Sequence, residues 1–179
     1  MKNIILLVFS TFFLISCVSK DSEKTVTIAS KYSLTIPSFL TKVNNLNEEA
    51  SLEYQHALKE FYVIALDDSK EAYRKTLVNK NLTNRYDNDF SGYVELLMFG
   101  MEHSLNIYQK SELKDTLINE LPAKTIQISG RMDGIDAYCY LAFINGEKNY
   151  YNIMTWTIAD KKYKYASKMI KLIHSFKEL

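Results

Sequence analysis

The alternation of apolar and polar residues predicts paired strands in the first part of the chain. Val26–Ile28 and Tyr32–Ile36 alternate in this way on either side of a short polar segment, which predicts two strands joined by a turn. Ala50–Gln55 and Glu60–Leu66 predict two further strands. The last of these is almost wholly apolar, so we expect it to lie inside the sheet and to be covered on both faces.

Two helices are predicted in the middle of the chain. Asp67–Ser69 is a turn and helix-cap signal, and apolar side chains recur on one helical face after it. Asp89 is expected to cap a longer helix from Phe90 to about Tyr108, whose apolar residues form a wide arc. Phe99 falls outside that arc, among polar residues, so we expect its ring to point away from the core.

The last third of the chain predicts strands followed by a helix. Thr116–Leu121 and Lys124–Met132 are expected to be strands on either side of Pro122. Asp133-Gly134 and Asn145-Gly146 are hairpin signals, and they flank the predicted strands Ala137–Ile144 and Glu147–Ile158.

Asp160 is expected to cap a final helix, whose buried stripe consists of Ala166, Met169, Ile170, Ile173 and Phe176. These elements predict an α+β fold, in which helices pack on the faces of an antiparallel sheet. We expect the strand from Tyr150 to Ile158 near the centre of the sheet, with the last helix packed across it.

The amino terminus predicts a membrane anchor. Ile4–Ile15 is apolar except for two hydroxyl residues, and as a helix it would rise about 18 Å. That is short of the ~30 Å hydrocarbon core, so the segment fits a secretory signal better than a membrane span. The residues that end it, Leu14-Ile15-Ser16-Cys17, resemble the lipobox of bacterial lipoproteins. The alternative is an ordinary signal peptide with an incidental cysteine.

The lipobox resemblance implies cleavage before Cys17 and acylation of its thiol. We therefore expect a signal peptide at 1–16, a lipidated tether at 17–24 and a single domain at 25–179. Two or more acyl chains give stable anchoring, so the expected location is the cell envelope. Val18, rather than an aspartate, follows the cysteine, and the resemblance to Gram-negative lipoproteins implies that this pattern favours the outer membrane. The sequence leaves open whether the domain faces the periplasm or the cell surface.

Charge argues against a nucleic-acid partner. The chain has 22 basic and 21 acidic residues, and removal of the signal peptide takes away Lys2 and no acid. The mature chain is then formally neutral, whereas nucleic-acid binders normally carry a basic surplus.

The order of the predicted elements resembles the PsbP-like fold. The resemblance rests on the opening "YSLTIP", the strand "EFYVIAL", and the strand containing Trp156 that leads into the helix ending "HSFKEL". This fold is named for an extrinsic subunit of photosystem II and is shared by a Ran-binding nuclear-import factor. The resemblance implies a binding or assembly factor more than an enzyme, and it brings no catalytic motif with it.

The residues that could carry chemistry do not form a recognisable motif. His56, His103 and His174 lack metal-ligand spacing, so no metal site and no cofactor is expected. Cys139 lies in an apolar strand and is expected to be a buried structural thiol. Asp133–Asp136 has too few oxygen ligands for a calcium loop and is expected to be a hairpin turn. No catalytic residue is therefore assigned.

Three features leave a role in recognition open. The aromatic residues around the last two strands are expected to pack in the sheet, with an aromatic-lined recognition face as the alternative: Tyr138, Tyr140, Tyr150, Tyr151 and Trp156. Phe99 is a candidate partner contact; otherwise it is an incidental exposed ring or is covered by the segment 79–88. Thr116 lies in a short pattern that resembles a Bacteroidetes-type O-glycosylation site, and it is a candidate acceptor.

Two functions follow from the sequence. The first is a membrane-anchored envelope lipoprotein whose domain is a non-enzymatic binding or assembly factor for a protein partner. The alternative is a small-ligand carrier or an enzyme with a pocket between sheet and helices. Convergent polar groups in a cavity would favour the alternative, and an exposed aromatic patch would favour the first.

Overall fold

A computed structural model describes residues 22–132 and 134–179 of the chain. The predicted signal peptide, Cys17 and all but the last residues of the tether lie outside this part. The strands are β1 (Glu23–Ile28), β2 (Tyr32–Pro37), β3 (Thr41–Lys42), β4 (Leu52–His56), β5 (Phe61–Ser69), β6 (Asn106–Lys110), β7 (Lys114–Ile118), β8 (Leu121–Met132), β9 (Ile135–Asn145), β10 (Asn149–Ile158) and β11 (Lys177–Glu178). The helices are α1 (Lys70–Asn79), α2 (Phe90–Ser104) and α3 (Lys162–His174), with short 3-10 turns at Ala57–Lys59 and Ala159–Lys161.

The main sheet is antiparallel, in the order β3-β4-β5-β10-β9-β8-β6, and β7 pairs with β8 beside β6. The position of β10 in the middle of this order confirms the prediction for the strand that contains Trp156. β1 and β2 form the predicted pair, and β11 joins them in a second, three-stranded sheet. The fold class is therefore the predicted α+β arrangement.

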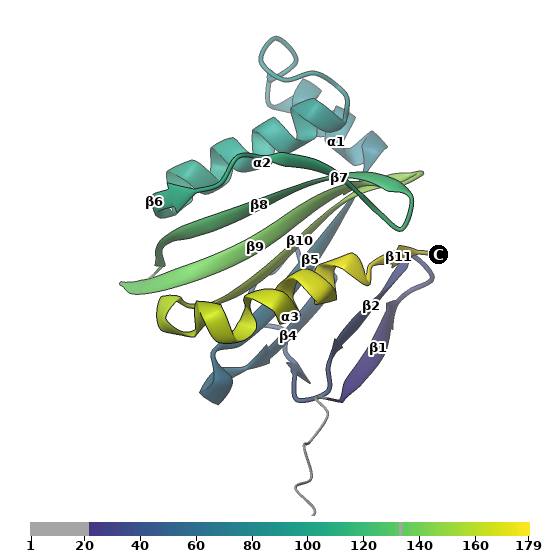
Figure 1. The fold of residues 1–179 in the computed structure, drawn as a ribbon. Helices are drawn as coiled ribbons and strands as arrows, with labels where there is room; N and C mark the ends of the chain where they lie inside the picture. Colours follow the sequence, from purple (N-terminus) through teal and green to yellow (C-terminus); the bar gives the residue numbers. More distant parts are fainter. Residues whose placement is uncertain (1–21, 133) are drawn as a thin grey trace, which may run out of the picture.

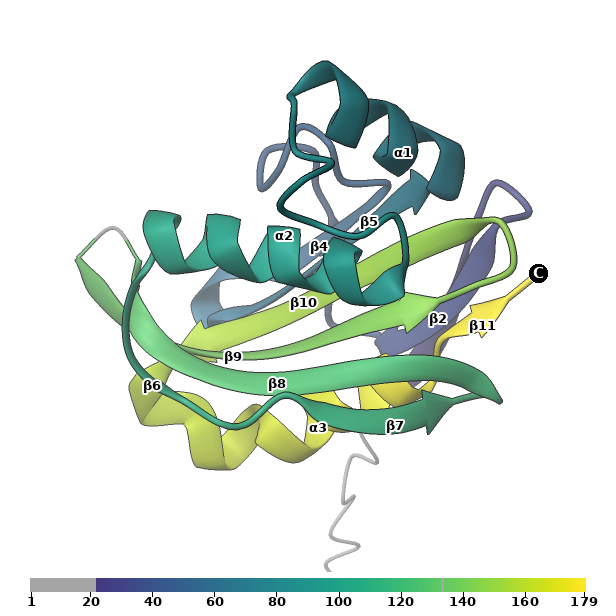
Figure 2. The ribbon, with the colours of Figure 1, turned by 90° about the horizontal axis from the view of Figure 1, so that it is seen from above.

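Helices and strands cover both faces of the main sheet (Figure 1). α1 and α2 lie on one face, while α3 lies on the other and runs across β10 and β9. The small sheet of β1, β2 and β11 lies beside α3 on that same side. Seen from above, α2 and α3 are separated by the curved strands of the main sheet (Figure 2).

The residues of β9 alternate between two buried cores. Tyr138, Tyr140 and Ala142 belong to the core beneath α3 and the small sheet. Cys139 and Leu141 belong to the core beneath α1 and α2. Successive side chains of a strand point to opposite faces, so a strand that is covered on both faces reads as a continuous apolar run.

The second helix ends earlier than predicted. α2 stops at Ser104, and the following segment Asn106–Lys110 is the edge strand β6, which pairs with β8. The predicted helix, which continued to about Tyr108, is therefore too long at its carboxyl end. Pairing with β8 supplies the backbone hydrogen bonds of these residues, and this long-range contact overrides the local helical pattern.

The sequence predicts strands on either side of Pro122, but the structure places Pro122 within a strand. It is the second residue of β8, and the turn lies earlier, at Asn119 and Glu120, which both have positive φ (46° and 70°). Two successive residues with positive φ form the kind of tight turn that suits a two-residue hairpin. Pro122 is tolerated because pairing of β8 with β9 begins only at the next residue, Ala123.

Three predictions of helix caps and turns are only partly correct. Ser69 does cap α1, since its hydroxyl accepts from the Ala72 N–H (3.0 Å), but Asp67 and Asp68 belong to β5 rather than to a turn. Asp160 lies in a 3-10 turn, and α3 begins without a side-chain cap. The predicted hairpin at Asn145 is present, but its loop comprises residues 146–148. A hydrogen bond from the Gly146 N–H to Asn149 O (3.0 Å) closes this loop.

Candidate functional site

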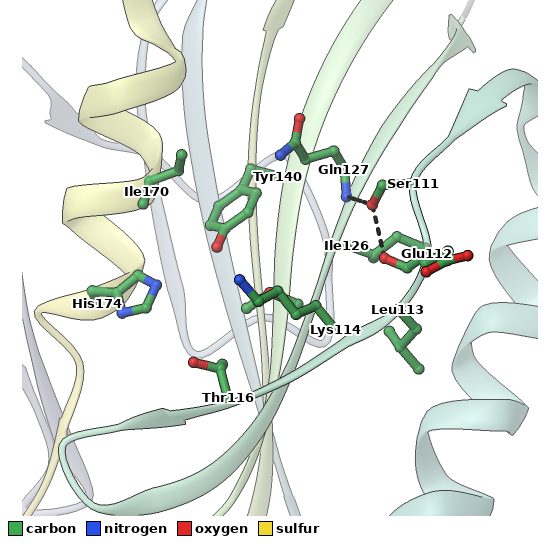
Figure 3. A pocket seen from close by; sticks show the side chains of 11 residues that line it. Ser111, Glu112, Leu113, Lys114, Thr116, Ile126, Gln127, Tyr140, Ile170 and His174 are labelled. Atoms are coloured by element: carbon green, nitrogen blue, oxygen red, sulfur yellow. Dashed lines mark hydrogen bonds between the residues drawn. The ribbon is translucent and has the colours of Figure 1, made fainter.

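An open cleft lies between α3 and the strands β7 and β8 (Figure 3). It has a volume of about 680 Å³, which is in the range of small-molecule sites. Its lining comes from β7 and the residues before it, from β8 and β9, and from α3: Ser111, Glu112, Leu113, Lys114, Thr116, Thr125, Ile126, Gln127, Tyr140, Ile170 and His174.

Strand register places the polar groups of the cleft on one face of the sheet. Lys114 of β7 lies opposite Thr125 of β8, and Gln127 of β8 lies opposite Tyr140 of β9. Directly opposed residues share a face, and this is the face on which α3 packs. α3 then adds His174 from its last turn.

The segment between β6 and β7 is fixed to β8 by hydrogen bonds. The Ser111 N–H donates to Gln127 O (2.9 Å), and the Gln127 N–H donates to Ser111 Oγ (3.1 Å). The Ser111 hydroxyl in turn donates to Glu112 O (2.9 Å). These bonds hold the start of β7, so Lys114 keeps its place at the wall of the cleft (Figure 3).

Tyr140 is one of the two buried polar residues of the cleft, with Thr125. Only 6% of the residue is exposed, and its ring stands between Gln127 and His174 with the hydroxyl directed toward His174 (Figure 3). Its neighbour Tyr138 donates from its hydroxyl to Gln127 Oε1 (3.1 Å). By contrast, no residue in the described ranges forms a hydrogen bond with the Tyr140 hydroxyl.

The described residues show no paired nucleophile and base. Cys139 is 2% exposed and faces the core under α1 and α2, as expected of a structural thiol. Burial raises the pKa of its thiol to about 12, which disfavours the nucleophilic thiolate. His56 accepts from the Lys59 N–H (3.2 Å) at a 3-10 turn and His103 lies on α2, so the fold does not bring either to His174.

Among residues 22–132 and 134–179, no group of three His, Cys, Asp or Glu side chains could hold a metal ion. Asp133, one of the two carboxylates of the expected hairpin turn, lies outside the described residues, and Met132 of β8 pairs with Ile135 of β9 next to it. The Arg131 guanidinium donates to both carboxylate oxygens of Asp136 (2.9 and 3.2 Å).

Most of the aromatic residues that left recognition open are core residues. Tyr138, Tyr140, Tyr150 and Tyr151 are buried. Trp156 is half-buried and stacks on Tyr62 with ring centroids 5.0 Å apart. This pair lines a smaller hollow, of about 360 Å³, next to the hairpin between β8 and β9.

Phe99 lies on the exposed side of α2 in an ordered surface cluster. The residue is 37% exposed, the Arg85 guanidinium lies 4.1 Å from the ring centroid, and the His103 ring centroid lies 3.9 Å away. The segment 79–88 therefore covers part of the ring through Arg85, and the rest remains open. Thr116 is half-buried at the cleft wall, where its hydroxyl is directed inward (Figure 3).

The sequence predicts packing for Tyr140, with an aromatic-lined recognition face as the alternative, and it gives His174 no role. It does not predict that these residues meet in one cleft. The period-two pattern of β7 places Lys114 and Thr116 on one face, but nothing in the sequence indicates that α3 lies opposite them. No described helix has the length and apolar character needed to cross a membrane.

No protein-family model matches this chain, and no curated protein matches it.

Comparison with solved structures identifies the fold. The solution structure of CyanoP, the cyanobacterial PsbP of Synechocystis sp. PCC 6803, covers 91% of this chain and 96% of its own, with 10% identity and a TM-score of 0.55. The crystal structure of LpqN, involved in cell envelope biogenesis of Mycobacterium tuberculosis, covers 88% and 90%, with 9% identity and a TM-score of 0.55. These likenesses confirm the PsbP-like fold that the element order predicted.

Proposed function

We propose that this chain is a lipoprotein of the cell envelope, anchored through Cys17 to the outer membrane, whose domain is a non-enzymatic binding or assembly factor for a protein partner. The lipobox-like residues Leu14-Ile15-Ser16-Cys17 support the anchor. A protein with the same fold, LpqN, is described as involved in cell envelope biogenesis, which agrees with this location.

The observation that carries the partner proposal is the surface cluster of Phe99, Arg85 and His103. The Phe99 ring is held between a guanidinium and an imidazole ring, and His103 Nδ1 lies 2.7 Å from Phe99 O. An apolar ring in a fixed position loses little conformational freedom on binding. Aromatic residues and arginine are also enriched among residues that dominate interface energies.

Site-specific photo-crosslinking in intact cells tests this surface. A photoreactive residue replaces Phe99 on α2 or, as the control, Tyr163 on α3, an aromatic residue that is 96% exposed. We expect one partner protein to be crosslinked from position 99 and not from position 163. Phe99→Ala should weaken capture of that same partner at least several-fold, whereas Tyr163→Ala should not. Equal crosslinking from both positions would contradict the proposal.

The anchor is tested separately by Cys17→Ser. We expect the wild-type chain in the membrane fraction with a mature amino terminus at Cys17 that carries acyl chains, and the variant as an unprocessed or released form. Mass spectrometry of the amino-terminal peptide distinguishes these outcomes. A mature terminus at another residue, without acyl chains, would contradict the anchor and leave the partner surface to be judged by its own experiment.

A further inference from the structure

We propose that the cleft between α3 and β7 binds a small organic anion, in which a carboxylate or phosphate group is carried on an apolar stem. This site lies apart from the Phe99 surface, so its test does not depend on the partner proposal. Three features of the cleft support this proposal: the unpaired hydroxyl of the buried residue Tyr140, the charges that face the cleft, and the apolar part of its lining.

The Tyr140 hydroxyl is the first observation. Buried polar groups in folded proteins nearly always form hydrogen bonds, because an unbonded one loses its bonds to water without replacement. Tyr140 is 94% buried as a residue, and its hydroxyl, which bonds to none of the described residues, is directed into the open cleft (Figure 3). Thr125 is also buried as a residue and lines the same cleft. The Tyr140 hydroxyl is therefore free to hydrogen-bond a ligand in the cleft.

The charge of the cleft selects an anion. The Lys114 ammonium group is directed into the cleft toward the space below Tyr140 (Figure 3), and no acidic side chain of the described residues pairs with it. Glu112, the one acidic residue of the lining, points away from the cleft (Figure 3). The nearby Asp115 pairs with Lys124 instead. Lys114 therefore offers an unpaired positive charge beside the His174 ring and the Thr116 hydroxyl.

Hydrogen bonds at the end of α3 reduce the repulsion that this helix end would exert on an anion. A helix carboxyl end normally presents free carbonyl oxygens that repel anions. Here the Ser175 hydroxyl donates to Leu172 O (2.6 Å), and the Ser175 N–H donates to Lys171 O (3.1 Å). The Phe176 N–H donates to Ile173 O (3.1 Å). These bonds satisfy the carbonyls of Lys171, Leu172 and Ile173, so fewer free carbonyl oxygens lie next to the His174 ring.

The apolar part of the lining accounts for the stem. Ile170, one turn before His174 on α3, and Leu113, before β7, line the cleft on opposite sides. The Tyr140 ring forms part of the wall between them (Figure 3). Apolar walls with a few placed polar groups are typical of small-ligand sites, in which the polar groups fix orientation and the walls bury the rest of the ligand.

Fluorine NMR of soluble probes tests the proposal. The full chain, in nanodiscs of zwitterionic lipid, is titrated with 4-fluorophenylacetate, with 4-fluorophenyl phosphate and with the neutral 4-fluorophenylacetamide; empty nanodiscs correct for partition into lipid. We expect at least one anion to bind about tenfold or more tightly than the amide, because a charge-assisted hydrogen bond is lost with the charge. The preferred anion identifies the charged group.

Variants assign the binding to the cleft. Lys114→Met and His174→Gln should each weaken binding of the anion about tenfold and bring it near that of the amide, and Tyr140→Phe should weaken it several-fold. Lys80→Met removes an exposed lysine at the end of α1 and should leave binding unchanged. Thermal unfolding of each variant confirms that the fold is retained.

An anionic phospholipid in the nanodiscs then distinguishes two sources of the anion. Competition with the probe assigns the site to a lipid headgroup, and no competition assigns it to a free acid. Equal binding of anions and amide, no detectable anion binding, or full binding by a folded Lys114→Met variant would overturn the proposal.

Discussion

At the scale of single residues, Glu178 ties the end of the chain to the hairpin between β9 and β10. Its carboxylate accepts from the Glu147 N–H and from the Tyr151 hydroxyl, both at 2.9 Å. Gly146 makes this approach possible, because a Cβ atom there would lie 2.2 Å from Glu178 Oε1 and 2.6 Å from the Tyr151 ring. Gly146, which the sequence marks as a turn residue, is therefore also needed for close packing against Glu178 and Tyr151.

Gly146→Ala should lower the free energy of unfolding by about 1–3 kcal/mol, the usual cost of overpacking. Chemical denaturation measures the loss. Gly100→Ala is the matched control, because a Cβ atom at Gly100 would meet no neighbour within 4 Å and alanine favours a helix by about 1 kcal/mol over glycine. Equal effects of the two substitutions would contradict the packing argument.

Cys139 should be protected from thiol reagents as long as the protein is folded. At pH 8 we expect slow reaction of the native chain with a disulfide reagent and rapid reaction after unfolding, because burial raises the thiol pKa to about 12. A pKa raised above the unfolded value of ~8.5 stabilises the fold fully below that pH, and the contribution is lost as the pH rises toward 12.

The measurement for Cys139 compares wild type with Cys139→Ala. The wild-type chain should lose more stability between pH 8 and pH 10 than the variant, because the two chains differ only in the Cys139 thiol. Rapid modification of the native thiol at pH 8 would show that the core under α1 and α2 opens readily.

At the scale of elements, short-range signals fail where a long-range partner decides. β6 replaces the last turn of the predicted helix because β8 offers a pairing edge. β7 and β8 meet at Asn119-Glu120, where the sequence has neither glycine nor proline. The Asn119 side-chain amide donates to Phe176 O, which anchors this turn to the end of α3.

Glu120→Gly should stabilise the hairpin of β7 and β8. Glu120 has φ of 70°, a conformation that costs a residue with a side chain about 1–2 kcal/mol, and glycine removes that cost at some expense in chain entropy. We expect a net gain of about 0.5–1 kcal/mol by thermal unfolding. Gly134→Ala, at φ of 83°, should lower stability. Lower stability of the Glu120→Gly variant would contradict the prediction and show that the Glu120 side chain is needed.

At the scale of the whole molecule, the carboxyl-terminal segment joins the two sheets. α3 packs on β9 and β10, Phe176 lies between Tyr32 and Tyr151 with ring centroids 5.5 and 4.8 Å away, and β11 pairs with β2. This segment is also one wall of the cleft, so stability and the proposed anion site depend on the same helix.

Truncation before Ile170 should abolish cooperative unfolding. It removes the buried Leu172, Ile173 and Phe176, each worth roughly 1.5–3 kcal/mol, and domains of this size are stable by only about 5–15 kcal/mol. Circular dichroism during heating measures this. Deletion of the exposed Leu179 alone is the control and should preserve a cooperative transition. A truncated chain that melts like the wild type would show that the main sheet folds without α3.

The sequence by itself determined the order of the main elements, the fold class, the central position of β10 and the burial of Cys139. These follow from the spacing of apolar residues, which reports how each segment is covered. Only the tertiary structure decided the end of α2, the place of the β7–β8 turn and the convergence of Lys114, Tyr140 and His174. Those features depend on contacts between residues far apart in the chain, such as β7 with α3, and no local pattern encodes which distant segment will supply the other wall.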